Sequence, residues 1–182
     1  MRGVIIVTAA ELAAIPSGTL ISKLGFVLSS GATPGPAGGN IQFYLENTAD
    51  VTNTKPASWA AITPTMTSVY NGAYSIPPAG GNVDLTLSTA FNYTGGSLYV
   101  AWDYTGSTFT STAAVYFSNN SLAGGWRGVY TIALPASDAT TTSSFRPNVR
   151  FTFTNPFTNE LNVNGVAGEK GIFNNTIKTT QT

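Results

Sequence analysis

Apolar and polar side chains alternate through residues 82–104, and this pattern predicts two β-strands that each bury one face. Between them, Gly95 and Gly96 can adopt the positive φ angles that a chain reversal needs. The pattern therefore predicts a hairpin, with the Trp102 face near the middle of a core. The alternating apolar positions are Val83, Leu85 and Leu87 in the first strand and Leu98, Val100, Trp102 and Tyr104 in the second.

Short runs of the same kind recur along the chain and are separated by turn residues such as Gly, Pro and Asn. Residues 4–7 predict a strand at a sheet edge or at the start of the fold. About nine short strands with almost no helix predict an all-β fold, an antiparallel, jelly-roll-like β-sandwich. The other predicted elements are strands at 19–29, 40–47, 66–76 (with a break at Asn71 and Gly72), 113–117, 128–134 and 148–154, and loops at 118–125 and 135–146.

Two connecting segments carry signals of their own. Residues 9–15 predict a helical turn, because Thr8 can cap it and Glu11 completes a capping box. Residues 48–64 form a long connection, and loops of this length inside compact domains are often functional.

A single β-sandwich domain is predicted over residues 1–155, because no linker divides this part of the chain. Residues 156–182 are rich in Asn, Thr and Gly with widely spaced apolar residues, which is typical of a linker or of the first strand of a following module. Within this tail, residues 173–180 could pair with a sheet edge of a neighbouring molecule by strand exchange.

Composition narrows the classes of function. Only 9% of the 182 residues are charged, and eight basic residues balance eight acidic ones, which excludes nucleic acid as an expected partner. The chain has no Cys and no His, so it lacks disulfides, thiolate metal sites, the usual zinc ligand and the usual general base. No apolar run approaches the roughly 20 residues that span a membrane. The polar but uncharged composition favours an extracellular or cell-surface location.

Five motifs follow one another along residues 8–155. They are Gly-Thr-Leu-Ile-Ser-Lys-Leu-Gly-Phe at 18–26, Ile-Gln-Phe-Tyr-Leu-Glu-Asn-Thr at 41–48, Val-Tyr-Asn-Gly at 69–72, Phe-x-Tyr-x-Gly-Gly-x-Leu-x-Val at 91–100 and Arg-Pro-Asn-Val-Arg at 146–150. In this order the chain resembles a β-sandwich module that recurs in large secreted and cell-surface proteins of Bacteroidota. The resemblance implies an exported, adhesin-like, multidomain parent, often exported through the type IX system. It implies no catalytic residue.

Catalysis is not predicted from the residues either. Asp84 and Asp103 are the most suggestive pair, because glycoside hydrolysis needs two facing carboxylates. The alternation points both away from the apolar faces, where solvated Asp residues help to keep a sheet soluble. No Ser has a His to activate it, and no phosphate-binding or dinucleotide motif is present.

A calcium site is one open interpretation. Glu46, Asn47 and Asp50 stand together at a strand-to-loop junction, where their oxygens could bind a structural calcium ion. Such residues are also common as turn formers, so both interpretations stay open.

Carbohydrate binding is a second open interpretation, because exposed aromatic rings can stack on sugars. The main candidates are Trp59 and Trp126, and the lesser ones are Tyr74 and Tyr104. Trp is more often buried than displayed, so a place in the core is the competing interpretation of each.

We therefore expect a non-enzymatic structural or adhesive module of an exported bacterial surface protein, with a surface glycan, a protein or neighbouring domains as partners. The alternative is a carbohydrate-binding module that uses loop aromatics, with or without calcium. The first hypothesis predicts a full apolar core and no deep polar cleft. The second predicts two or more aromatic side chains exposed on one face.

Overall fold

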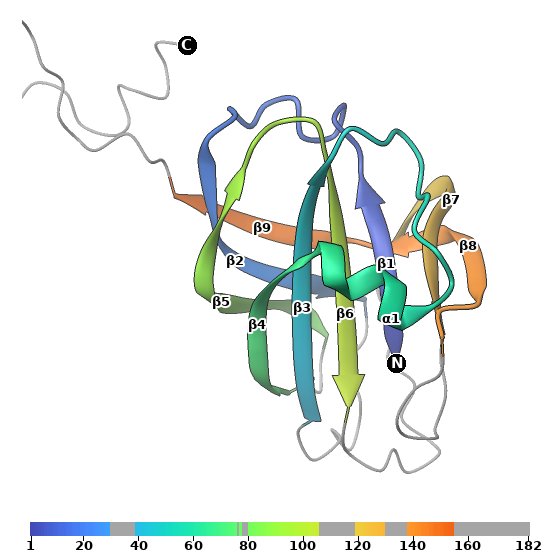
Figure 1. Ribbon diagram of the computed structural model, residues 1–182. Coiled ribbons are helices and arrows are strands. Elements are labelled where there is room, and N and C mark those ends of the chain that lie inside the picture. The colour runs from blue at the N-terminus through green and yellow to red at the C-terminus, as the bar shows by residue number, and fades with distance from the viewer. Residues whose placement is uncertain (30–38, 76, 78–79, 106–118, 130–137, 155–182) are drawn as a thin grey trace, which may run out of the picture.

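The computed structural model describes residues 1–29, 39–75, 77, 80–105, 119–129 and 138–154 (Figure 1). These residues form nine β-strands, one short α-helix and one turn of 3₁₀-helix. In this described part, no helix is long and apolar enough to cross a membrane. The elements are β1 (Arg2–Val7), β2 (Thr19–Leu28), β3 (Gly39–Thr48), α1 (Trp59–Ile62), η1 (Thr63–Thr65), β4 (Thr67–Tyr74), β5 (Gly81–Tyr93), β6 (Ser97–Thr105), β7 (Asn119–Val129), β8 (Thr141–Pro147) and β9 (Val149–Thr154).

The strands form two antiparallel sheets, which confirms the predicted all-β sandwich. The larger sheet has six strands in the order β4-β3-β6-β1-β7-β8, and the smaller has three in the order β5-β2-β9. In Figure 1, β2 and β9 cross behind the larger sheet. The jelly-roll connection pattern stays a prediction. The predicted strand at 113–117 and the tail at 156–182 lie outside the described residues.

The hairpin predicted for residues 82–104 is wrong, because its two strands lie in different sheets. β5 pairs with β2 in the smaller sheet, whereas β6 pairs with β3 and β1 in the larger one. Gly95 and Gly96 do take positive φ angles of 92° and 80°, so the chain turns where the sequence predicted. The turn carries the chain from one layer to the other, and the local alternation fits both arrangements equally well.

Residues 4–7 lie in β1, the first strand of the fold, which is one of the two predicted positions; it is an interior strand between β6 and β7 and not an edge strand. Two further predictions need correction. Asn71 and Gly72 lie inside β4 and make no turn, because both pair with β3. The predicted loops at 118–125 and 135–146 contain most of β7 and β8, whose small and polar residues suit strands near a solvated sheet edge.

Apolar cores cover both faces of the larger sheet. Between the sheets, Phe26 of β2 packs against Phe43 and Trp102, with ring centroids 5.4 and 5.2 Å away. On the outer face, a covering segment (residues 49–66) lies across the sheet, and Figure 1 shows α1 in front of the strands. Strand β6 is therefore buried on both faces. The outer core consists of Val4, Ile6, Trp59, Ile62, Met66, Tyr99, Ala101 and Ala139.

Gly25 stands in the middle of the smaller sheet, where β2 pairs with β5 on one side and β9 on the other. A Cβ atom at this position would lie 1.9 Å from the carbonyl oxygen of Val83. We expect Gly25→Ala to lower the free energy of unfolding by about 1–3 kcal/mol, as overpacking does. Urea denaturation of the two proteins measures this difference.

Ser22→Ala, on the same strand, is the matched control. Ser22 makes an exposed hydrogen bond to the Thr152 carbonyl at 3.1 Å, so its loss should change the free energy of unfolding by no more than about 0.5 kcal/mol. Equal effects of the two substitutions would contradict the close approach of β5 to Gly25.

Candidate functional site

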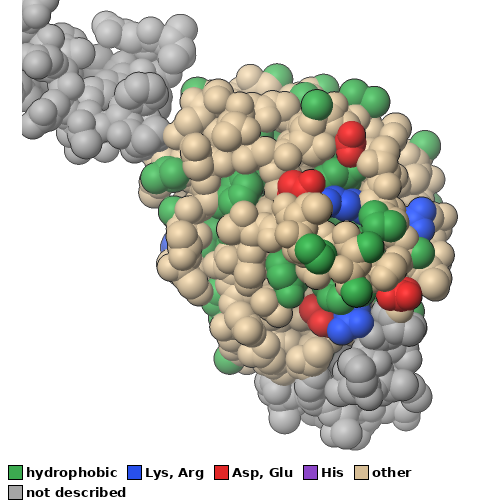
Figure 2. All heavy atoms as spheres, viewed as in Figure 1, with side chains coloured by type: hydrophobic (Ala, Val, Ile, Leu, Met, Phe, Trp, Pro, Cys, Tyr) green, Lys and Arg blue, Asp and Glu red, His purple; other side chains and the backbone are tan. Residues whose placement is uncertain are grey.

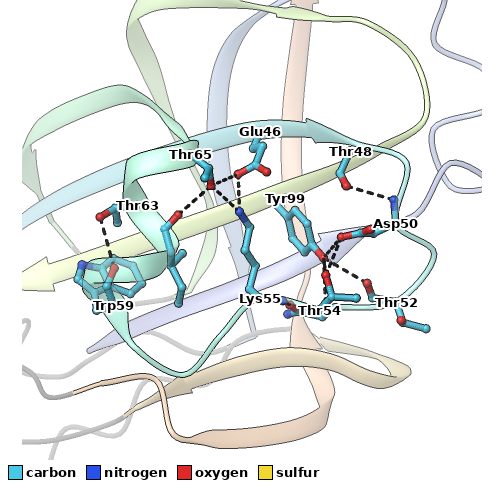
Figure 3. Close-up of polar contacts among 12 residues, drawn as sticks. Glu46, Thr48, Asp50, Thr52, Thr54, Lys55, Trp59, Thr63, Thr65 and Tyr99 are labelled. Atoms are coloured by element: carbon cyan, nitrogen blue, oxygen red, sulfur yellow. Dashed lines mark hydrogen bonds and ion pairs between the residues drawn. The ribbon is translucent and has the colours of Figure 1, made fainter.

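Glu46, near the end of β3, is held by the covering segment (Figure 3). Its carboxylate forms an ion pair with the Lys55 ammonium and accepts a hydrogen bond from the Thr65 hydroxyl at 2.8 Å. Lys55 is only 8% exposed and donates to the same hydroxyl at 2.9 Å. Because a buried ammonium is stable only with such partners, this contact fastens the covering segment to β3.

Asp50 makes a second attachment, to the phenol of Tyr99 on β6 (Figure 3). The hydroxyls of Tyr99 and Thr54 both donate to Asp50 Oδ2, each at 2.7 Å, and the Thr54 N–H donates to the Tyr99 oxygen at 2.9 Å. These bonds from Tyr99 and Thr54 hold the pKa of Asp50 below its usual value of 3.8. Lys55 Nζ lies 5.0 Å from the centroid of the Tyr99 ring, so the two attachments adjoin each other.

The Asn47 side chain makes its hydrogen bonds at a different position, beside the turn between β5 and β6. It donates to the Asn92 carbonyl at 2.9 Å and accepts from the Thr94 N–H at 3.0 Å. The three residues predicted to bind calcium therefore use their oxygens on different protein partners. Over the described residues, no three His, Cys, Asp or Glu side chains are grouped to hold a metal ion.

Trp59, the first residue of α1, lies in the outer core and is 8% exposed. Its ring packs edge-on against Tyr44, with centroids 6.1 Å apart, and the Arg2 guanidinium carbon lies 5.3 Å from the ring centroid. Its backbone N–H donates to Asp138 at 2.9 Å. Trp59 thus holds the covering segment in place, and its ring is not displayed for stacking on a sugar.

Tyr74 and Tyr104 are buried and pack edge-to-face, with ring centroids 5.9 Å apart. Burial raises the pKa of Tyr74 above its usual range, and its hydroxyl has no hydrogen-bond partner among the described residues. Trp126 of β7 is half-buried and packs against the inner core. Of the four predicted stacking aromatics, only Trp126 reaches the surface in part, so no aromatic platform is assembled from them.

The structure also separates Asp84 from Asp103. Asp84 lies on β5 in the smaller sheet and pairs with Arg150 Nε at 3.1 Å, whereas Asp103 lies on β6 in the larger sheet and pairs with Arg2 Nε at 2.9 Å. Each carboxylate therefore has a guanidinium partner, and the two do not form the facing pair that glycoside hydrolysis needs.

Beside β9 lies an apolar groove with a volume of about 300 Å³, which the sequence did not predict. The groove lies beyond the β9 edge of the three-stranded sheet, and at its base are Ile5 and Val7 of β1, which are only 1% and 9% exposed. The turn at residues 9–15 borders the groove on the other side. The apolar side chains of this β9 groove are Ile5, Val7, Leu12, Ile15, Pro147, Val149, Phe151 and Phe153.

Arg146 makes the polar part of the β9 groove and is only 4% exposed. Its guanidinium donates to the Ile6 carbonyl, to the Glu11 carboxylate and to Asn120 Oδ1. The Thr8 N–H and hydroxyl each donate to Glu11 at 2.8 Å, the predicted capping box. Partial burial acts to raise the pKa of Glu11, but the bonds from Arg146 and Thr8 outweigh it and hold this pKa below its usual range. Arg146 therefore ties β8 to β1 and to the turn.

The signal for this groove lay in the Arg-Pro-Asn motif at 146–148. Pro147 ends β8 and Asn148 carries the chain from the larger sheet to the smaller one, where β9 begins. Proline has no N–H to continue a strand ladder, so it suits a crossing between sheets. The motif alone does not show that β9 lies at a sheet edge, because that depends on how distant strands pair.

Comparison of the chain with protein-family models, with curated proteins and with solved structures found no match in any of the three.

Tyr99→Phe removes one hydroxyl from the attachment between the covering segment and β6. We expect it to lower the free energy of unfolding by about 1–3 kcal/mol, because Asp50 and the Thr54 N–H both lose a partner. Tyr70→Phe is the matched control, since its hydroxyl makes an exposed bond to the Ala73 carbonyl at 2.9 Å. Similar losses in both variants, measured by urea denaturation, would contradict a special role for Tyr99.

The same variant has a pH signature. Because the folded-state pKa of Asp50 is lowered, its stabilising contribution is present above pH 3.8 and is lost as the pH falls through the folded-state pKa. In Tyr99→Phe we expect the pKa of Asp50, followed by NMR titration, to rise towards 3.8. An unchanged pKa would show that Tyr99 is not its main partner.

Proposed function

We propose that this chain is a non-enzymatic structural or adhesive module of an exported bacterial surface protein. The observation that carries the proposal is that each described carboxylate is used by the fold itself. Of the eight acidic residues, Glu160 and Glu169 lie outside the described part, which leaves six. Their partners are Arg146 for Glu11, Lys55 for Glu46, Tyr99 for Asp50, Arg150 for Asp84, Arg2 for Asp103 and the Trp59 N–H for Asp138.

These contacts suit a structural role. Each one joins segments that are distant along the chain or fastens the covering segment to a strand. General acid–base chemistry requires a carboxyl group within reach of a substrate, and none of these six is left without a protein partner. The polar groups of the described residues therefore support a role in holding the fold together.

The surface character supports the exported location. Figure 2 shows one face of the molecule, on which most of the side chains are uncharged and the few acidic and basic ones are scattered, some of them side by side. This agrees with 9% charged residues and no Cys in the whole sequence. The resemblance to modules of Bacteroidota surface proteins points to the same location.

The alternative of carbohydrate binding has less support. It needs two or more aromatic rings displayed together, whereas Trp59, Tyr74 and Tyr104 are in the interior. Among the four candidates only Trp126 is half-exposed, and it contributes to the inner core, whereas Phe145 on the neighbouring β8 is 67% exposed.

Thermal unfolding of the full chain with calcium, with EDTA and with a glycan panel tests the proposal. A ligand that binds only the folded state raises stability, by about 2.7 kcal/mol at a hundred times its Kd. We expect the midpoint to be the same in all conditions. A midpoint raised by a glycan and restored to its original value in Trp126→Ala would instead support the carbohydrate-binding alternative.

A further inference from the structure

β9 is one of the two edge strands of the smaller sheet, and among the described residues it pairs only with β2. The backbone groups on its other side border the β9 groove. Its side chains alternate, with Val149, Phe151 and Phe153 facing the core and Arg150 exposed. An edge strand of this kind offers a row of N–H and C=O groups to another strand.

The β9 groove has the chemistry to accept an extended peptide. A strand added beside β9 would bond to its backbone, and every second side chain would point towards Ile5 and Val7 of β1. Most of those side chains should be apolar, because two thirds of the lining residues are apolar and the nitrogens of Arg146 are already bonded within the fold. The opposite face of the added strand must be polar, because it lies in solvent beside Arg150.

The chain itself contains such a peptide, immediately after β9. In residues 157–163 the apolar residues Phe157, Leu161 and Val163 share one strand face, together with Asn159. The other face carries Thr158, Glu160 and Asn162. On an added strand this second face would place Glu160 on the same side of the sheet as Arg150, which favours the pairing.

The connection to β9 favours a second copy as the acceptor. Only Asn155 and Pro156 separate residues 157–163 from the end of β9 at Thr154. Proline restricts its own φ to negative values and disfavours all but extended conformations in the residue before it. The favoured two-residue hairpin loops need positive φ angles at one or both central residues, so an Asn-Pro sequence disfavours a tight turn directly back onto the same β9.

We propose that residues 157–163 of one copy add as a strand to β9 of a second copy and fill its β9 groove. Donor and acceptor are different surfaces, so the contact is head-to-tail and builds a ring or an open chain of molecules. This proposal rests on the proposed structural role, because the second copy of the chain would be the partner of that structural module. Ligand binding in the thermal-unfolding experiment would refute the structural role, whereas a chain that stays monomeric would refute strand addition alone.

Two full-length variants separate donor from acceptor. Leu161→Asn with Val163→Asn removes the apolar face of the donor, and Val166→Asn with Ile172→Asn, outside both 157–163 and 173–180, is its matched control in the same tail. Ile15→Lys places a charge in the β9 groove from a half-buried position, and Ala14→Lys is its control on the exposed side of the same turn. Circular dichroism and thermal unfolding establish that each variant is folded.

Sedimentation velocity over a wide range of concentrations gives the readout. We expect the wild type and both controls to associate, and the donor and acceptor variants to lose at least about tenfold in affinity, or roughly 1.4 kcal/mol. A mixture of the donor and acceptor variants retains one intact groove and one intact donor strand, so it should form a 1:1 dimer and nothing larger.

Three results would overturn the proposal. The wild type could stay monomeric at every concentration, or the control variants could lose association as much as the test variants. The donor variant could also associate as the wild type does, while its monomer unfolds at a lower temperature than the wild-type monomer. That result would place residues 157–163 in the groove of their own copy.

Discussion

Burial of β6 on both faces is the constraint on which the rest of this fold depends. Its inner face, with Trp102, packs under the smaller sheet, and its outer face, with Tyr99, packs under the covering segment. A strand with two apolar faces is stable in water only when both are covered. The ion pair between Lys55 and Glu46 and the bonds around Tyr99 hold the outer cover in place.

Local features of the structure could be predicted from the sequence, and long-range ones could not. The capping box of Thr8 and Glu11 and the turn at Gly95 and Gly96 depend on neighbouring residues, and both are present. Which strand pairs with β5 depends on the whole chain, so the predicted hairpin was wrong. Alternation indicates one buried face, but it does not show whether a distant segment buries the other.

The candidate site residues illustrate the same limit. Trp59 was a reasonable choice for an exposed loop aromatic, because the sequence does not show that its loop folds over Tyr44. Glu46 and Asp50 are close in sequence, yet one reaches Lys55 and the other Tyr99. Proximity along the chain was therefore a poor guide to which oxygens share a partner.

The β9 groove offers a partner the backbone groups of an edge strand and a mainly apolar lining. The smaller sheet stops at β9, and the β9 groove lies where another strand would continue it. The proposed strand addition would thus follow from the unequal widths of the two sheets. A sheet edge of this kind favours assembly over chemistry on a small substrate.

Amide hydrogen exchange of the full chain, recorded at low and high protein concentration, tests this account most directly. We predict that the β9 amides not bonded to β2 exchange quickly when the protein is dilute and become protected when it is concentrated, while the amides of β6 stay protected throughout. Fast exchange of those β9 amides at both concentrations would contradict the account, because it would leave the sheet edge without a partner strand.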